Sequence, residues 1–163
     1  MKEPSVVHST FVIERSYPQS PEKVFAAFAD AAKKRRWFGE SEGHDIEEFA
    51  MEFRVGGSEV ARYRFKQGTP FPGVELRNEG TYQDVVPNSR VVTASTMTLG
   101  DKRISASLVT IELLAMDKGT DLICTHQGAF FEGADGPQMR EAGWRQLLER
   151  LGKELARPLA EHA

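Results

Sequence analysis

The sequence has little of several features that would reveal a function at once. Its 163 residues include a single cysteine, Cys124, which excludes an internal disulfide and any zinc or iron-sulfur site built from several thiolates. With 21 Lys and Arg against 24 Asp and Glu, the net charge is −3, so the basic excess typical of nucleic-acid binding is missing. No apolar run approaches the roughly 18 residues of a membrane span, and the N-terminus lacks the apolar segment of a signal peptide. We therefore expect a cytoplasmic protein with no membrane span and no nucleic-acid partner.

The common catalytic and metal-binding motifs are also missing. No two of the four histidines have the spacing of a metal site. The chain has no Gly-rich phosphate loop, no Gly-x-Ser-x-Gly turn and no His-Glu-x-x-His motif. We therefore predict no metal, no cofactor and no catalytic residues that a motif would identify.

Local patterns near the N-terminus predict a strand followed by two short helices. Residues 8–16 alternate in part between apolar and polar side chains, which is typical of a strand. The segment 20–22 then supplies a hydroxyl cap, a proline for the first helical position and an acid for the first turn. Asp30 can cap a second short helix over residues 31–38.

Short β-type runs separated by turn residues follow between residues 44 and 127. Parallel strands would need a crossover helix between each pair, and no helical pattern intervenes, so the spacing predicts an antiparallel meander. Together with the first strand, these runs give about seven strands in one sheet. The predicted runs are 44–55, 58–65, 74–86, 90–99, 104–116 and 120–127.

A long amphipathic helix is predicted over residues 135–156. Its apolar residues recur at steps of three and four, with charges between them. The concave face of a twisted sheet is the only surface large enough to cover this stripe. The element order predicts one α+β domain over residues 1–163, with a cavity wherever sheet and helix side chains do not meet. The stripe consists of Met139, Trp144, Leu147, Leu148, Leu151 and Leu155.

Several short motifs, taken with this element order, resemble a known family. The motifs are Ser20-Pro21-Glu22-Lys23-Val24-Phe25, Trp37, Arg54-Val55-Gly56-Gly57, Gly80-Thr81-Tyr82 leading to Val86-Pro87-Asn88-Ser89-Arg90-Val91-Val92, Gly119-Thr120-Asp121-Leu122 and Gly143-Trp144. Over about residues 9–156 they are similar to the Activator of Hsp90 ATPase homologue 1-like (AHSA1) branch of the START/Bet v 1-like (SRPBCC) superfamily. The resemblance implies a helix-grip fold and a cavity, and leaves the content of the cavity open. Most of the motifs have structural reasons, and we expect Gly143 to let the long helix approach the sheet closely.

A set of aromatic and polar side chains is the candidate ligand-binding set. It consists of Trp37, Tyr63, Tyr82, His126, Phe130 and Trp144. His126 has two interpretations, either a half-exposed histidine at a strand end or a polar group at the cavity mouth that binds a ligand or acts as acid or base. Cys124 should share its face and pack as a small apolar side chain. For Trp37 and Trp144, packing in the core is the alternative to ligand contact.

The third and fourth strands carry acids, phenols and guanidinium groups. A period of two places Tyr82 and Asp84 on one face and Glu79 on the other. Tyr63 lies opposite its two arginine neighbours. The sequence leaves open which face of the fourth strand points inward. The basic run 33–36 is interpreted as a solvated helix face, because acids follow closely.

Binding of a small apolar or aromatic molecule in the cavity is the function that we predict. A regulator of the Hsp90 ATPase is one alternative, which the resemblance implies. The eukaryotic co-chaperones carry a separate N-terminal domain with the main stimulating motif, and we expect no space for it here. The other alternative is a cyclase, dehydratase or hydrolase that pairs His126 with Asp84 or Glu79.

A homodimer is a further expectation. The edge strands of an open sheet offer unpaired backbone groups to a second chain. Aromatic side chains expected on the surface at Phe71, Phe130 and Phe131 would add apolar contact area.

Overall fold

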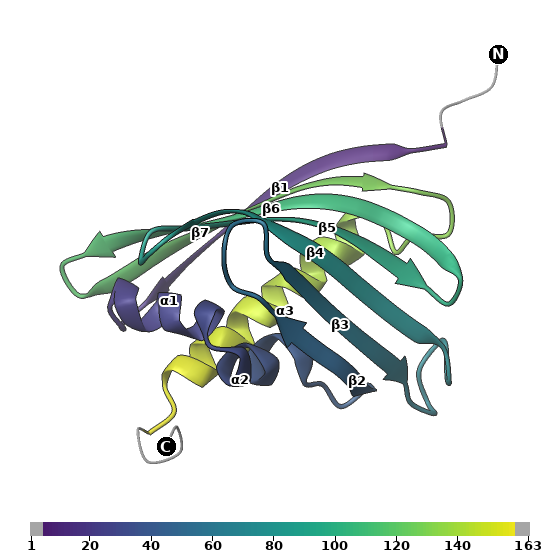
Figure 1. Ribbon diagram of the computed structural model, residues 1–163, viewed down its shortest axis with the longest axis horizontal. Coiled ribbons are helices and arrows are strands. Elements are labelled where there is room, and N and C mark those ends of the chain that lie inside the picture. The colour runs from purple at the N-terminus through teal and green to yellow at the C-terminus, as the bar shows by residue number, and fades with distance from the viewer. Residues whose placement is uncertain (1–4, 159–163) are drawn as a thin grey trace.

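A seven-stranded antiparallel sheet forms the body of the molecule (Figure 1). The computed structural model describes residues 5–158, and its strands lie in the order β1-β7-β6-β5-β4-β3-β2. The meander runs from β2 to β7, and β1 pairs with β7, so the predicted topology and strand number are confirmed. The strands are β1 (Val7–Tyr17), β2 (His44–Met51), β3 (Ser58–Phe65), β4 (Glu75–Val86), β5 (Arg90–Leu99), β6 (Lys102–Met116) and β7 (Gly119–Phe130).

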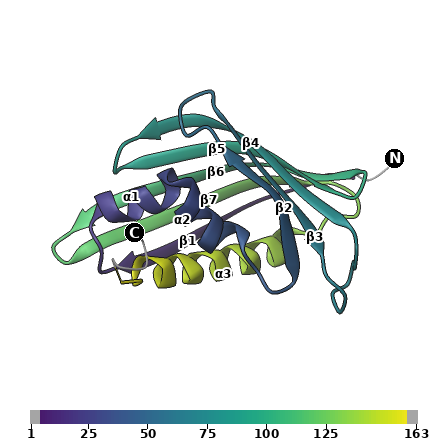
Figure 2. The same cartoon turned by 60° about the horizontal axis from the view of Figure 1, so that its bottom comes forward.

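The helices all lie on one face of this sheet (Figure 2). They are α1 (Pro21–Ala29), α2 (Ala31–Lys34), the π-helical turn η1 (Arg35–Gly39) and α3 (Pro137–Leu155). The predicted caps are confirmed, since the Ser20 and Asp30 side chains accept hydrogen bonds from backbone amides three residues on. The predicted second helix is divided, because its last turn widens into η1. Within residues 5–158, no helix has the length and apolar character needed to cross a membrane.

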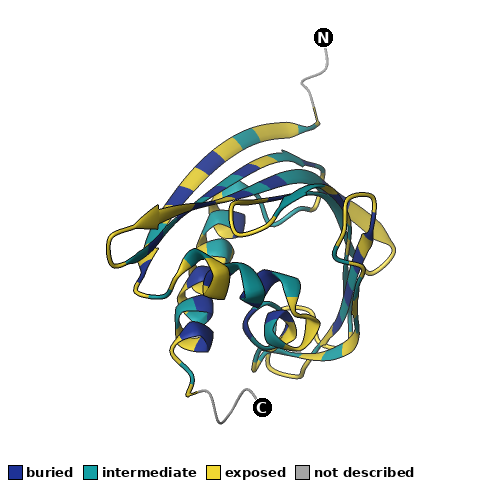
Figure 3. Cartoon of the chain, turned by 60° about the vertical axis from the view of Figure 1, so that its left-hand side comes forward, coloured by how far each residue is buried: buried dark blue, intermediate teal, exposed yellow. Residues whose placement is uncertain are grey.

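The sheet curves around the helices, and buried and exposed residues alternate along its strands (Figure 3). The apolar core lies between the concave face and the C-terminal half of α3. From α3, Leu148, Leu151 and Leu155 enter this core. The prediction that the sheet covers the apolar side of the long helix is therefore confirmed for this half. Met139, at the other end of the predicted stripe, is 68% exposed.

A buried hydrogen bond holds α3 against β1. The hydroxyl of Tyr17 donates to the Leu148 carbonyl over 2.7 Å. Gly152 makes this approach possible, since a Cβ there would lie 3.3 Å from Cε1 of Tyr17. The close-approach role predicted for Gly143 is wrong, because a Cβ at that position would meet nothing within 4 Å.

A β-bulge in β4 separates two residues that the sequence placed on one face. Tyr82 pairs with Thr93, but Asp84 pairs with Val92, so one extra residue enters β4 between them. Tyr82 is consequently fully buried, whereas Asp84 turns to the outer surface and forms an ion pair with Arg90. The predicted shared face of Tyr82 and Asp84 is wrong because the bulge resets the period of two.

Lys34 contradicts the prediction of a solvated basic run. Its side chain is buried, and its ammonium group forms an ion pair with Oε1 of Glu59 on β3. The same carboxylate oxygen accepts a hydrogen bond of 2.7 Å from the hydroxyl of Tyr82. Because α2 packs over the sheet, this one lysine points inward while Arg35 remains exposed.

Phe130 contradicts the prediction of an exposed aromatic residue. The strand β7 continues three residues past its predicted end at residue 127, so the alternation turns Phe130 inward, where it is 2% exposed. Phe71 is 49% exposed, as expected. Phe131 is half-buried.

The buried ion pair generates a prediction about stability. Lys34→Met should lower the free energy of unfolding by about 3 kcal/mol at pH 7, because Glu59 would stay buried without its partner. Adding Glu59→Gln should recover on the order of 1–2 kcal/mol, because the amide oxygen carries no charge and still accepts from Tyr82. Urea unfolding measures both effects. Arg54→Met, which breaks an exposed pair with Glu52, is the control and should cost under about 0.5 kcal/mol.

A double variant that is no more stable than Lys34→Met would contradict this account. The loss would then come from the packing of the Lys34 side chain and not from an uncompensated charge on Glu59.

Candidate functional site

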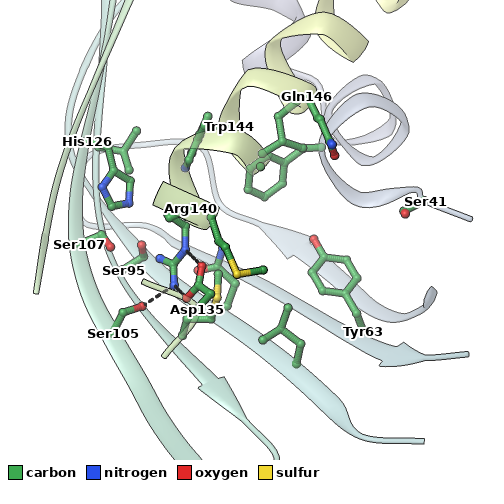
Figure 4. Close-up of a pocket in the computed structure, with 18 of the residues that line it drawn as sticks. Ser41, Tyr63, Ser95, Ser105, Ser107, His126, Asp135, Arg140, Trp144 and Gln146 are labelled. Atoms are coloured by element: carbon green, nitrogen blue, oxygen red, sulfur yellow. Dashed lines mark hydrogen bonds and ion pairs between the residues drawn. The ribbon is translucent and has the colours of Figure 1, made fainter. Parts of the chain in front are cut away.

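A cavity of about 300 Å³ lies between the concave face of the sheet and the N-terminal half of α3 (Figure 4). Its wall combines side chains from η1, from strands β2 to β7 and from α3. The strands carry Ser95, Ser107 and His126 on one side of this space, and α3 presents Trp144 on the other. The main apolar wall consists of Phe38, Leu76, Met97, Val109, Trp144 and Leu147.

The cavity exists because small residues occupy a cross-strand row on its floor. Gly128 of β7 pairs with Ser107 of β6, which pairs with Ser95 of β5, which in turn pairs with Gly80 of β4. Directly opposite residues in an antiparallel sheet share a face. Serine and glycine therefore occupy the positions at which larger side chains would fill the space below α3.

His126 lies in the middle of β7 and is 1% exposed. Its ring stacks on Phe11, with centroids 4.6 Å apart, and on Phe130 at 6.2 Å. Gly128 permits this packing, since a Cβ there would lie 2.9 Å from Cε1 of the imidazole. The interpretation of a half-exposed histidine at a strand end is thus wrong, because β7 is longer than its sequence pattern indicated.

The electrostatic state of this histidine follows from its surroundings. Burial, and then the positive charge of Arg140, lower the pKa of His126 from 6.5 to about 4, so the imidazole is neutral at pH 7. Its Nδ1 is buried and has no hydrogen-bond partner within residues 5–158. A neutral imidazole offers one donor and one acceptor.

Arg140 ties the first turn of α3 to the sheet. Its Nε and Nη2 donate to the two carboxylate oxygens of Asp135 over 2.8 and 2.7 Å, and Nη2 also donates to Oγ of Ser105 over 3.0 Å. The guanidinium lies 5.1 Å from the ring centroid of Phe130. The charge of Arg140 is therefore balanced within the wall of the cavity. Arg140 is one of the charges that separate the apolar positions of the predicted helix, and no local signal in the sequence marks it.

A smaller space of about 40 Å³ adjoins the main cavity. Trp37 and the ion pair of Lys34 with Glu59 line it. The two spaces are neighbours, since they share the wall residues Phe38, Asn78, Ser95, Val109 and Trp144.

The residues predicted to bind a ligand divide into two groups. Tyr63, His126 and Trp144 line the main cavity. Trp37 lines only the smaller space, where it is 1% exposed and its indole N–H donates to the Ala27 carbonyl. Two further candidates lie behind the cavity wall as core residues, namely Tyr82 and Phe130.

The acid-base pairs considered for an enzyme do not form. Asp84 and Glu79 lie on the convex face, where each forms an ion pair with an arginine, whereas His126 points into the concave side. Cys124 shares the inward face of His126, as predicted. Burial raises the pKa of its thiol to about 12, so it carries no thiolate at pH 7.

The lowered pKa of His126 predicts how stability depends on pH. The unfolded chain binds the proton near pH 6.5 and the folded chain only near 4, so stability present above pH 6.5 is lost as the pH falls toward 4. Wild type should lose about 2–3 kcal/mol more over this interval than His126→Phe, which keeps a flat ring in the stack with Phe11 and Phe130.

Urea unfolding at a series of pH values measures this difference. His8→Ala, which removes an exposed histidine of β1, is the control and should follow the wild-type curve. Parallel curves for wild type and His126→Phe would disprove the assignment.

The chain is similar to several solved structures. The Mll3558 protein from Rhizobium loti is 50% identical, with a TM-score of 0.82 over 93% of this chain and 99% of that one. A protein from Rhizobium leguminosarum is 32% identical, with a TM-score of 0.87 over 94% and 98% of the two chains. An AHSA1-like protein from Aeromonas hydrophila shares the fold at 20% identity and a TM-score of 0.66, over 90% of this chain and 92% of that one.

Two further comparisons address the family itself. A search of the curated proteins finds no match. The sequence profile described as Activator of Hsp90 ATPase homolog 1-like protein matches residues 18–156. This match covers the helices, the whole meander and α3. The chain, with its helix-grip fold, therefore belongs to the Activator of Hsp90 ATPase homolog 1-like family.

Proposed function

We propose that this protein binds a small, mainly apolar molecule in the cavity between the sheet and α3. The observation that carries the proposal is a space of about 300 Å³ whose wall combines aromatic and aliphatic side chains with a few polar groups. Ligand sites in proteins have this composition, and volumes of roughly 300 Å³ mark their lower limit. A cavity of about half that volume already binds benzene, so a molecule of roughly two fused rings fits.

The state of the polar groups supports binding over catalysis. Arg140 is engaged by Asp135, and Lys34 by Glu59. A general acid or base works best with a pKa near the operating pH, whereas the pKa of His126 is about 4. These groups are suited to shape the site and to orient an occupant.

Membership of the family supports the same function. The SRPBCC fold commonly binds hydrophobic ligands. The cavity between the sheet and α3 offers this chain a place to bind one. The name of the family points instead to a chaperone ATPase, and that alternative predicts an effect on the ATPase rate without any small molecule.

Naphthalene, 2-naphthol and 1-decanol should therefore raise the melting temperature of the purified protein in a saturable way. Only binding to the folded state stabilises it. At about ten times Kd the gain is about 1.4 kcal/mol, or roughly 3–5 °C for a chain of this size. Differential scanning calorimetry measures the shift.

A variant with a filled cavity makes this test specific. Ser95→Leu places three extra carbon atoms in the space, so it should keep or raise the melting temperature of the free protein and reduce the shift. Ala94→Leu alters the neighbouring residue on the convex face and should leave the shift intact. Equal shifts in the two variants would place binding outside the cavity, and no shift with any compound would favour the chaperone alternative.

A further inference from the structure

We infer that the cavity selects a flat apolar molecule that carries a neutral hydroxyl or carbonyl oxygen, which a line of uncharged polar side chains on its floor recognises. The inference rests on the proposed function and names the chemical class of the occupant. The line runs across four strands and is called the polar diagonal below. It consists of Asn78 of β4, Ser95 of β5, Ser107 of β6 and His126 of β7.

The strand register places these residues in a row. Ser95 and Ser107 are directly opposite partners on β5 and β6. Asn78 lies opposite the residue two positions after Ser95, and His126 lies opposite the residue two positions after Ser107. Even offsets keep all of them on the concave face, and diagonal neighbours of this kind lie roughly 7–8 Å apart. All members of the polar diagonal line the cavity.

One atom of the polar diagonal is buried without a hydrogen-bond partner within residues 5–158, namely Nδ1 of His126. Polar groups in a protein interior are normally paired. Elsewhere in the same wall this rule is obeyed, since Ser105 accepts from Arg140. Asn78, Ser95 and Ser107 are half-buried and line the cavity beside this imidazole. The polar diagonal therefore offers hydrogen bonds to a molecule in the cavity.

The charge of the occupant follows from the charges already present. Arg140 is balanced by both oxygens of Asp135, and Lys34 is balanced by Glu59 in the adjoining space. Arg150 also lines the cavity, and it donates to the Glu40 carbonyl in an exposed hydrogen bond. The polar diagonal itself contains only hydroxyls, an amide and a neutral imidazole. A carboxylate or an ammonium group buried against the polar diagonal would therefore have no counter-ion there, and burial of an unpaired charge is strongly unfavourable. A neutral oxygen meets both donors and acceptors there.

The opposite wall determines the body of the occupant. Phe38 of η1 and two residues of α3, Trp144 and Leu147, provide the apolar part of the wall on the helical side. Figure 4 shows Trp144 across the cavity from the strands that carry Ser95, Ser107 and His126. The ring centroids of Phe38 and Trp144 lie 5.9 Å apart, and the two rings are tilted by 53° to each other. A flat ring system would pack on this surface with its oxygen toward the polar diagonal.

Three probes of one shape test the inference by isothermal titration calorimetry at pH 7. They are naphthalene, 2-naphthol, which is neutral, and 2-naphthoate, which is charged. We expect 2-naphthol to bind about fivefold tighter than naphthalene, as one net hydrogen bond would provide. We expect 2-naphthoate to bind more weakly than either.

A matched set of serine variants locates the preference. Ser95→Ala with Ser107→Ala removes both central hydroxyls at almost constant volume. The double variant should bind naphthalene within about twofold of wild type and should prefer 2-naphthol by less than about twofold. Ser58→Ala removes an exposed serine of β3 and should keep the full preference.

The possible outcomes separate the inference from the proposed function. Equal affinity for naphthalene and 2-naphthol in wild type, tightest binding of 2-naphthoate, or a preference that survives in the double variant would each overturn the inference while ligand binding stands. Failure of all three probes to bind would overturn the proposed function as well.

Discussion

The position of α3 is the constraint on which the rest of the structure depends. Its C-terminal half is fixed by Leu148 and Leu151 in the core and by the hydrogen bond from Tyr17. Its first turn is fixed by Arg140, which binds Ser105 of β6 and Asp135. Protein interiors close up to the density of organic crystals wherever backbone can move. Because α3 is fixed at both ends, it cannot move closer to the serine and glycine residues of the sheet. The space between α3 and these residues therefore remains as the cavity.

Two ion pairs, one buried and one partly buried, lie at the margins of this space and define its geometry. Lys34 with Glu59 joins α2 to β3, and Arg140 with Asp135 anchors the start of α3. Buried pairs gain little net stability, because desolvation offsets most of the attraction between the charges. Their directional contacts do restrict how the helices sit over the sheet. Since both charges are neutralised locally, the floor between them is left to uncharged groups, and this is what gives the cavity its selectivity in our proposal.

The sequence predicted the fold well because the signals for a meander are local. The alternation of apolar and polar residues, the turn residues and the helix caps are each defined by residues a few positions apart. These local signals were enough to place all of the strands. It failed where the cause is distant. Lys34 is buried by a partner 25 residues away, and Arg140 binds a serine 35 residues away. The bulge after Tyr82 has no residue signature, and it reversed the face of Asp84. Large or titratable cavity residues such as Tyr63, His126 and Trp144 can be chosen as candidates from the sequence. Ser95 and Ser107 cannot, because only the strand register shows that they lie side by side in the cavity.

The polar diagonal also reconciles a cavity of this size with a stable fold. A dry apolar void forfeits the contacts of its lining, at roughly 24 cal/mol for each Å³, and a protein of ordinary stability tolerates little of this. The hydroxyl, amide and imidazole groups of the cavity can form hydrogen bonds with water, and water in a protein needs two to four polar partners. An apolar molecule that displaced such water would leave these groups unpaired, and a charged group beside them would lose its own hydration without gaining a counter-ion there. A neutral oxygen on an apolar body avoids both penalties, so in our proposal the polar groups that make the cavity compatible with a stable fold also select its ligand.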